Sequence, residues 1–424
     1  MLESTESLLP KASGASGNKS LRVVSMGETA ESLDELGRLL TTLGVELVDR
    51  ILVVHKKVHP ATFVGKGKLE EAKALMDAKD CDAFIIDFDL SPNQLRNVEK
   101  VIGKPVMDRS GVIIEIFSRH ARTKEAKTQV ELAKLQYLLP RLAHFWTHFE
   151  RQRGGGTGMR GMGEKQIEVD RRLVKTRMSI LRSRLAEIEK ERKIKRSSRK
   201  EVLKVALVGY TNAGKSTLLN RLTDSQVRAE DKLFATLDPS VRSLDPHCHP
   251  PIVAIDTVGF ISRLPHALVA SFRSTLEELH EADLLLHVVD GSSPEARAQY
   301  DVTETVLKDL GLEKKPKVTV LNKSDLVQGV GNRLGLKLVV PGAAVLSAMN
   351  DSDIQKLKKI IQDHFHGQLE VYEIVIPYDQ SKVEALIHAH GAIEVQRHLE
   401  KGTFFRVRME QGWAKKLGLE KYRT

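Results

Sequence analysis

Short apolar runs alternate with helical patterns between Leu21 and Arg119. The apolar runs are "LRVVSMG", "ELVDRILVV", "CDAFIIDF" and "KPVMD", and the helical patterns between them are "ESLDELGRLLTTLG", "GKLEEAKALMDAK" and "SPNQLRNVEKVIG". Strands that alternate with helices are typical of βαβ units. The pattern predicts an α/β domain with a parallel sheet over residues 21–122, preceded by a disordered tail at residues 1–20.

The stretch "FVGKGK", Phe63 to Lys68, contains two glycines and two lysines. No strong strand precedes it, and it lacks a full phosphate-binding spacing. A turn at the start of a helix is therefore favoured over a nucleotide site.

The hydrophobic period changes to a spacing of three and four residues from Lys124 onward, which is typical of paired helices. Two seams follow this spacing: Leu132, Leu135, Leu139, Leu142, Trp146 and Phe149, then Ile167, Val174, Met178, Leu181, Leu185 and Ile188. They predict an antiparallel helical hairpin over residues 123–200, with a kink at Pro140.

The loop between the two seams is "RGGGTGMRGMGEK", Arg153 to Lys165. By composition it is either a flexible linker or a basic tip that can follow a phosphate backbone closely, because glycine has no side chain in the way. Residues 151–204 hold eighteen Lys and Arg against seven Asp and Glu, a surplus of +11 in a chain of net charge +10. The remainder therefore sums to −1, and this segment is either a solvated helix face or a nucleic-acid contact.

The composition is that of a chain with several globular domains and much helix. Cys81 and Cys248 are too few for a disulfide framework, which fits a reducing compartment. The first twenty residues lack the basic start and apolar core of a signal peptide, and no run of about eighteen apolar residues follows. We expect a cytoplasmic, monomeric protein without a membrane segment.

A phosphate-binding motif begins the central domain, residues 201–367. "GYTNAGKS", Gly209 to Ser216, matches G-x-x-x-x-G-K-[ST] between the apolar strand "VLKVALVG" and the helical "STLLNRL". Backbone N–H groups and the helix N-terminus point at the phosphates, so Gly209 and Gly214 keep the backbone bare. Lys215 reaches the β- and γ-phosphates, and Ser216 offers a hydroxyl to Mg²⁺.

Three later segments select guanine. "IVAIDTVGF" is a strand that ends with Asp256, whose carboxylate can hold the Mg²⁺ shell. It is followed by Gly259, whose N–H can bond the γ-phosphate. "VTVLNKSD" supplies Asp325, whose carboxylate can accept two hydrogen bonds from guanine but not from adenine. "VLSAM" supplies a backbone N–H for the guanine O6.

Three features of this domain have alternative readings, and a fourth, Phe260, bears on the rate of hydrolysis. Thr236 in "LFATLDPS" is a further Mg²⁺ ligand or a surface threonine. Asn212 resembles the asparagine of potassium-stimulated GTPases, or is a turn residue that tolerates its backbone angles. Phe260 stands where many GTPases have a water-orienting glutamine, so slow intrinsic hydrolysis is expected. "DPHCHPP", Asp245 to Pro251, is read as a hairpin turn rather than a metal site.

The predicted site residues fall into four groups. Nucleotide binding is assigned to Gly209, Tyr210, Thr211, Asn212, Ala213, Gly214, Lys215, Ser216, Thr217, Asp256, Gly259, Asn322, Lys323, Asp325, Ser347, Ala348 and Met349. Catalysis is assigned to Lys215, Thr236 and Gly259, and Mg²⁺ binding to Ser216, Thr236 and Asp256, the last directly or through water. RNA contact is assigned to Arg153, Arg160, Lys165, Arg171 and Arg172.

The ordered set "FVGKGK", "LLPRL", "RGMGEKQIEVDRR", "GYTNAGKSTLLN", "FATLDPS", "DTVGF" and "NKSD" resembles the HflX family of ribosome-associated GTPases over nearly all of the chain. The resemblance implies an N-terminal α/β domain with a helical hairpin, a P-loop GTPase and a small C-terminal domain. The pattern of residues 368–424, a strand, a helix and two strands, independently predicts a small α+β domain.

The resemblance also implies a function. Family members bind the large ribosomal subunit and its rRNA, direct the hairpin tip toward the peptidyl-transferase region, and are associated with splitting stalled or idle ribosomes. The alternatives are a ribosome-assembly or RNA-modification GTPase, a protein-binding switch without an RNA partner, and an N-terminal domain that binds ATP and acts on RNA. No second catalytic constellation is legible for a modification enzyme, and the +11 segment argues against a switch without RNA.

Overall fold

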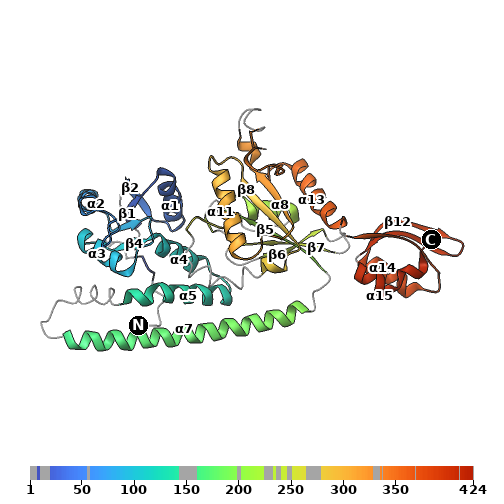
Figure 1. Cartoon of the computed structure of the whole chain (residues 1–424), viewed down its shortest axis with the longest axis horizontal. Helices are drawn as coiled ribbons and strands as arrows, with labels where there is room; N and C mark the ends of the chain where they lie inside the picture. The colour runs from blue at the N-terminus through green and yellow to red at the C-terminus, as the bar shows by residue number, and fades with distance from the viewer. Residues whose placement is uncertain are drawn as a thin grey trace. The chain divides into compact units, whose positions relative to one another are not determined.

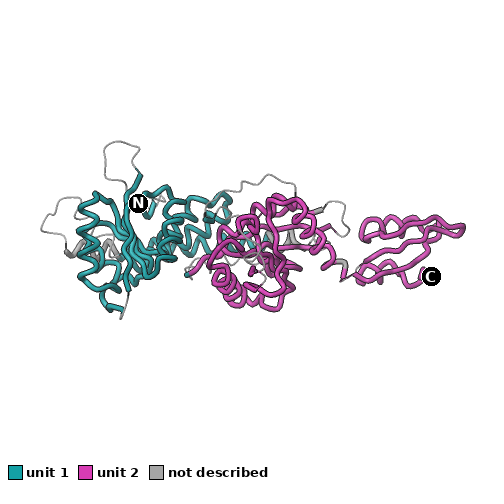
Figure 2. Tube along the Cα trace, turned by 90° about the horizontal axis from the view of Figure 1, so that it is seen from above, with its two compact units in different colours: residues 1–194, 230–238, 263–275 teal, residues 195–229, 239–262, 276–424 magenta. Residues whose placement is uncertain are grey.

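The computed structural model describes residues 7–9, 20–54, 58–142, 160–197, 202–223, 233–234, 240–245, 251–263, 278–327, 335–336, 338–367, 369–409 and 411–423. The chain forms two compact units, coloured separately in Figure 2. Unit 1 comprises residues 1–194, 230–238 and 263–275, and unit 2 comprises the remainder. Each unit is described by itself below.

Unit 1 is built on a four-stranded parallel sheet in the order β2-β1-β3-β4 (Figure 1). Its strands are β1 (Arg22–Gly27), β2 (Glu46–Leu52), β3 (Ala83–Ile86) and β4 (Val106–Asp108), and its connecting helices are α1 (Ala30–Thr42), α2 (Lys66–Ala78) and α3 (Pro92–Ile102). Apolar side chains of β1 and β3 pack with those of α2 and α3 in one core. The predicted parallel α/β fold is confirmed, and α2 begins at Lys66, so "FVGKGK" is the turn that starts a helix.

Helix α4 (Arg109–His120) was not predicted from the sequence. Its residues Arg109 to Phe117 are all buried, so it lacks the polar face that identifies a surface helix. Asp108 caps its first turn by accepting a hydrogen bond of 2.9 Å from the Gly111 N–H.

The two hydrophobic seams pack against each other as α5 (Lys124–Leu138) and α7 (Arg160–Ser197), which lie side by side in Figure 1. The buried seam residues are Leu132, Val174, Met178 and Leu181. At Pro140 the α-helix gives way to the 3₁₀ turn η1 (Leu139–Arg141), because proline lacks the N–H that α-helical bonding needs.

The loop prediction for residues 153–165 is wrong over residues 160–165, which form the first turns of α7. Glu164, Lys165 and Gln166 are strong helix formers, and helix propagation from a formed turn is easier than nucleation. Residues 153–159 lie outside the described part of the chain.

Unit 2 contains a six-stranded sheet in the order β10-β9-β8-β5-β7-β6, parallel except for the pairing of β6 with β7. The strands are β5 (Leu203–Gly209), β6 (Ser240–Asp245), β7 (Ile252–Asp256), β8 (Leu284–Asp290), β9 (Lys317–Asn322) and β10 (Ala344–Val345), and the helices are α8 (Lys215–Thr223), α11 (Ala296–Asp309), η2 (Ser324–Leu326) and α13 (Asp351–His366). Alternate β5 residues face opposite cores: Val205 and Leu207 join a cluster with α8 and α13, whereas Ala206 and Val208 join one with α11. The parallel strands are thus covered on both faces.

A three-stranded antiparallel sheet, β11-β13-β12, follows at the C-terminal end of unit 2. Its strands are β11 (Glu370–Ile376), β12 (Ala392–Leu399) and β13 (Gly402–Met409). Helix α14 (Ser381–His390) connects β11 to β12, and α15 (Gln411–Leu417) and η3 (Leu419–Tyr422) follow β13. Buried side chains of the sheet pack against α14, α15 and η3. Across the part of the chain that the structure describes, no helix combines the length and apolar character needed to cross a bilayer.

Candidate nucleotide site

The glycine loop between β5 and α8 passes very close to neighbouring strands. Gly209 has φ +149°, and a Cβ there would lie 2.1 Å from the carbonyl oxygen of Val288. Gly214 has φ +88°, and its Cβ would lie 2.4 Å from Asn322 Nδ2. Only glycine fits both the angles and the space, so the two glycines fix the bare backbone that phosphate groups can approach.

Lys215 is the first residue of α8 and is buried. Its Nζ donates hydrogen bonds of 3.1 Å to the Gly209 carbonyl and 2.7 Å to the Tyr210 carbonyl. Burial lowers the pKa of Lys215 to about 8, while the charge of Asp256 opposes that shift. An ammonium at a helix N-terminus, held in a dry site, is a strong partner for a phosphate anion.

Ser216 and Asp256 lie within hydrogen-bonding distance: Ser216 Oγ donates to Asp256 Oδ2 at 2.7 Å. Asp256 ends β7 and is fully buried. A hydroxyl beside a carboxylate is an oxygen donor set of the kind that Mg²⁺ prefers, so the two residues fit a magnesium site. Thr236, the third predicted Mg²⁺ ligand, lies outside the described residues.

The segment after Asp256 lies against the glycine loop. The Phe260 N–H donates to the Gly209 carbonyl at 3.1 Å, and the Thr211 N–H donates to the Phe260 carbonyl at 2.7 Å. A Cβ on Gly259 would lie 2.9 Å from Thr211 Cγ2 and 3.0 Å from Lys215 Nζ. Gly259 therefore packs against Lys215, the residue expected to bind the γ-phosphate.

Asn322 connects the glycine loop to the "VLSAM" loop. Its Nδ2 donates to the Ala213 carbonyl at 3.0 Å, and its Oδ1 accepts from the Ala348 N–H at 2.9 Å. Both side-chain groups of this buried asparagine are used, which fixes the distance between the phosphate end and the predicted base end of the site.

The predicted base-binding residues come together around Asp325, which is exposed. Ser347 Oγ donates to Asp325 Oδ1 at 2.5 Å and accepts from the Met349 N–H at 3.1 Å. Lys323 has φ +61° and its Nζ lies 2.7 Å from Asp290 Oδ2. Sequence reasoning missed Asp290, although its place at the end of β8, beside Asn322 of β9, could have indicated it.

A polar pair between the buried His287 and the half-buried Glu304 was also missed. His287 Nδ1 lies 3.0 Å from Glu304 Oε1, and its ring stacks on Tyr300 with centroids 4.8 Å apart. Burial lowers the pKa of His287, and the hydrogen bond from His287 is the main cause that lowers the pKa of Glu304 to about 2. This pair joins β8 to α11.

The predicted RNA-contacting residues are only partly described. Arg171 and Arg172 are exposed on α7. Arg160 and Lys165 lie in the first turns of the same helix, and Arg153 lies outside the described residues. Residues 246–250 of "DPHCHPP" also lie outside, and among the described residues no group of three His, Cys, Asp or Glu could hold a metal. The site roles of all these residues stay predictions.

Three family models match consecutive parts of the chain. "GTP-binding GTPase N-terminal" matches residues 30–118, "GTP-binding GTPase Middle Region" matches residues 120–199, and "50S ribosome-binding GTPase" matches residues 204–323. Together these matches follow the N-terminal sheet, the helical hairpin and the phosphate-loop sheet.

Curated relatives are similar over nearly the full length. "GTPase HflX" of Caldanaerobacter subterraneus subsp. tengcongensis is 40% identical over 384 residues, covering 90% of this chain and 88% of the relative. "GTPase HflX" of Escherichia coli (strain K12) is 40% identical over 376 residues, covering 88% of each. Among solved structures, a GTP-binding protein from Sulfolobus solfataricus in complex with GDP is similar at 24% identity and a TM-score of 0.43, covering 81% of this chain and 98% of that one.

Proposed function

Because this chain belongs to the HflX family of GTPases, we propose that it binds the large ribosomal subunit and that its hydrolysis of GTP drives the splitting of stalled or idle ribosomes. The observation that carries the proposal is the contact of Gly259 with Lys215, because it joins a phosphate-binding residue to a segment that can move when the γ-phosphate arrives or leaves. A nucleotide-dependent change of this kind is what a splitting factor needs.

The proposed ligand is GTP or GDP with Mg²⁺. Asp325, oriented by Ser347, would accept hydrogen bonds from guanine, and the Ala348 N–H region would meet O6. Ser216 and Asp256 would hold Mg²⁺, together with Thr236. When bound, the metal neutralises charge on the β- and γ-phosphates, while Lys215 and the backbone N–H groups position the phosphate chain.

The proposed RNA-binding region is the hairpin helix α7 and the residues that precede it. Arg171 and Arg172 are exposed there, in the segment that carries the whole basic excess of the chain. The model matched by residues 204–323 is described as a ribosome-binding GTPase, which supports the same partner. Binding through phosphates releases counterions, so affinity for the large subunit should fall steeply between about 50 and 200 mM salt.

The test combines GTP hydrolysis with and without purified large subunits and gradient sedimentation of intact ribosomes. Splitting and stimulated hydrolysis are expected for the parent chain, and both should fall in the variant Arg171→Ser/Arg172→Ser. Lys308→Ser/Lys314→Ser removes two exposed lysines from the GTPase domain and is the matched control. Stimulation by large subunits without splitting would instead favour a ribosome-assembly GTPase, and no binding to subunits would favour a protein-binding switch.

A further inference from the structure

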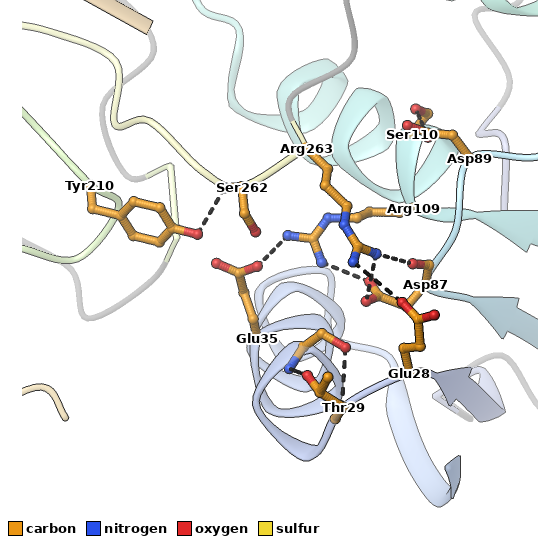
Figure 3. Close-up of polar contacts among 11 residues, drawn as sticks. Glu28, Thr29, Glu35, Asp87, Asp89, Arg109, Ser110, Tyr210, Ser262 and Arg263 are labelled. Carbon is orange, nitrogen blue, oxygen red and sulfur yellow. Dashed lines mark hydrogen bonds and ion pairs between the residues drawn. The ribbon is translucent and has the colours of Figure 1, made fainter. Parts of the chain in front are cut away.

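The two ends of the unit 2 site are supported by different strands. At the phosphate end, the segment after β7 contacts the glycine loop, and the Ser262 N–H donates to the Tyr210 hydroxyl at 2.8 Å (Figure 3). At the predicted base end, the support comes from β8, whose last residue, Asp290, lies beside Asn322 of β9. Asp290 lies outside the segments that the sequence assigns to nucleotide binding, yet its contacts lead directly into one of them.

Both carboxylate oxygens of Asp290 have fixed partners. Oδ1 accepts hydrogen bonds of 3.0 Å from the Ser292 N–H and 2.6 Å from the Ser292 hydroxyl. Oδ2 lies 2.7 Å from Lys323 Nζ. The turn after β8 also packs on the end of β9, since the Gly291 N–H donates to the Asn322 carbonyl at 2.8 Å. The carboxylate is thus oriented with one oxygen toward its own turn and the other toward Lys323.

The ion pair of Asp290 and Lys323 is partly shielded from water. The Asp290 side chain is 16% exposed and the Lys323 side chain 24%. Within the part of the chain that the structure describes, no other acid forms an ion pair with the Lys323 ammonium. A Cβ built on Gly214 would lie 3.9 Å from Lys323 Cε, so the lysine stem passes the glycine loop on its way to β8. The pair therefore holds the ammonium at the end of β8.

A second acid, Asp325, lies only two residues after Lys323, in the turn η2. Its Oδ1 accepts a hydrogen bond from the Ser347 hydroxyl. An ammonium bound to this carboxylate would use lone pairs that the guanine N1–H and N2 amine need. Asp325 is exposed, and water weakens an ion pair there, whereas Asp290 offers the ammonium a less hydrated partner. Asp290 is therefore the stronger of the two competing acids.

We propose that Asp290 is a positioning residue that determines selectivity for guanine. It holds the Lys323 ammonium at the end of β8 and so leaves the Asp325 carboxylate free to accept hydrogen bonds from the base. Asp290 acts through Lys323 and does not touch the nucleotide. The inference rests on the guanine site of the proposed function and adds to it a residue that sets its selectivity.

The experiment measures dissociation constants for GDP and inosine diphosphate with the full-length chain and Mg²⁺. Inosine diphosphate lacks the N2 amine, so it offers Asp325 one hydrogen bond instead of two, and the parent should prefer GDP. In Asp290→Asn the amide oxygen can still accept from Ser292, which leaves the amide nitrogen, a donor, facing the Lys323 ammonium. The GDP affinity should fall about tenfold, and the preference for GDP over inosine diphosphate about fivefold.

The preference separates positioning from a loss of stability, because partial unfolding lowers both affinities by the same factor. Lys323→Met removes the ammonium and keeps an apolar stem, so the double variant Asp290→Asn/Lys323→Met should regain most of the parent's preference. Asp301→Asn is the matched control, because it removes the acid of an exposed ion pair with Arg297 on α11. It should leave the preference unchanged.

An unchanged preference in Asp290→Asn would overturn the inference, as would a lowered preference that the double variant does not restore. If the parent prefers GDP, either result concerns Asp290 alone and leaves the guanine site of the proposed function intact. A parent that binds GDP and inosine diphosphate equally would overturn both the assignment of Asp325 and the inference that depends on it. No ribosome takes part in the measurement, so a failure to split ribosomes does not affect the result.

Discussion

The carboxyl edges of the unit 1 and unit 2 sheets present different chemical groups. At the edge of the unit 2 sheet, Gly209 and Gly214 leave the backbone bare, and the buried ammonium of Lys215 lies near the buried carboxylate of Asp256. At the edge of the unit 1 sheet, Arg109 fills the corresponding place with bonds to Glu35 and Asp87, and Arg141 bonds Asp108 at 3.1 Å.

The difference leads us to expect phosphate binding at the unit 2 edge rather than at the unit 1 edge. Bare backbone at a helix N-terminus presents N–H donors to an anion. The unit 1 edge presents carboxylates, which repel phosphate and attract a guanidinium. We therefore expect the nucleotide site at the unit 2 edge, whereas the unit 1 edge holds the guanidinium of Arg109, and the predictions below test that contrast.

Removal of the unit 1 guanidinium should have the largest effect. Arg109→Ala leaves Glu35 and Asp87 buried without their shared cation, so the free energy of unfolding of unit 1 should fall by about 3–5 kcal/mol. Hydrogen exchange at β1 and β3 amides, with urea unfolding followed by circular dichroism, measures it. The control Arg38→Ala removes an exposed arginine of α1. A loss below about 1 kcal/mol in Arg109→Ala would show that the edge does not depend on its ion cluster.

The second-largest effect is expected from a substitution at the base-binding end of the unit 2 site. Asp325→Asn places an amide donor against the guanine amine, so GTP binding should weaken by about 2–3 kcal/mol while xanthine nucleotides are accepted. Equilibrium titration with both nucleotides measures the change in preference. Asp309→Asn alters an exposed acid on α11 and should change neither affinity. Unchanged GTP binding in Asp325→Asn would refute the assignment of Asp325.

The buried ammonium of unit 2 predicts a pH dependence of nucleotide binding. Burial holds the Lys215 pKa at about 8, and a bound phosphate raises it because the anion favours the charged form. Binding at and above pH 8 must therefore take up a proton, and affinity should fall about fivefold between pH 8 and pH 9. Calorimetry in buffers of different ionisation enthalpy detects the uptake. The arginine in Lys215→Arg does not titrate in this range, so the variant should lack the part of the pH dependence that comes from Lys215. An identical dependence of affinity on pH in the parent and the variant would contradict the assignment of Lys215 to phosphate binding.

The glycine-rich edge of the unit 2 sheet could be predicted from the sequence, whereas the charged edge of the unit 1 sheet could not. A phosphate loop depends on a local spacing, and Gly209, Lys215 and Ser216 lie within eight consecutive residues between a strand and a helix. The parallel sheets and the paired seams of α5 and α7 were also predictable, because hydrophobic period reports burial directly.

The charged edge could not be predicted because its members are far apart in sequence. Glu35, Asp87 and Arg109 come from three elements, and none belongs to a motif of fixed spacing. Helix α4 was missed for a related reason, since burial on all sides removes the amphipathic pattern. The prediction of a loop over residues 160–165 gave glycine content more weight than the helix formers beside it.

The smallest expected effect concerns Asn212, which has φ +60° within the glycine loop. If its side chain helps to hold K⁺ near the phosphates, GTP hydrolysis should be about threefold faster in K⁺ than in Na⁺, the size of one exposed charge contact. Asn212→Gly keeps the left-handed backbone at no steric cost, so it removes only the side chain. The variant should hydrolyse GTP at equal rates in both salts while retaining GDP affinity. Equal rates already in the parent chain would leave Asn212 as a turn residue, chosen for its tolerance of that backbone angle.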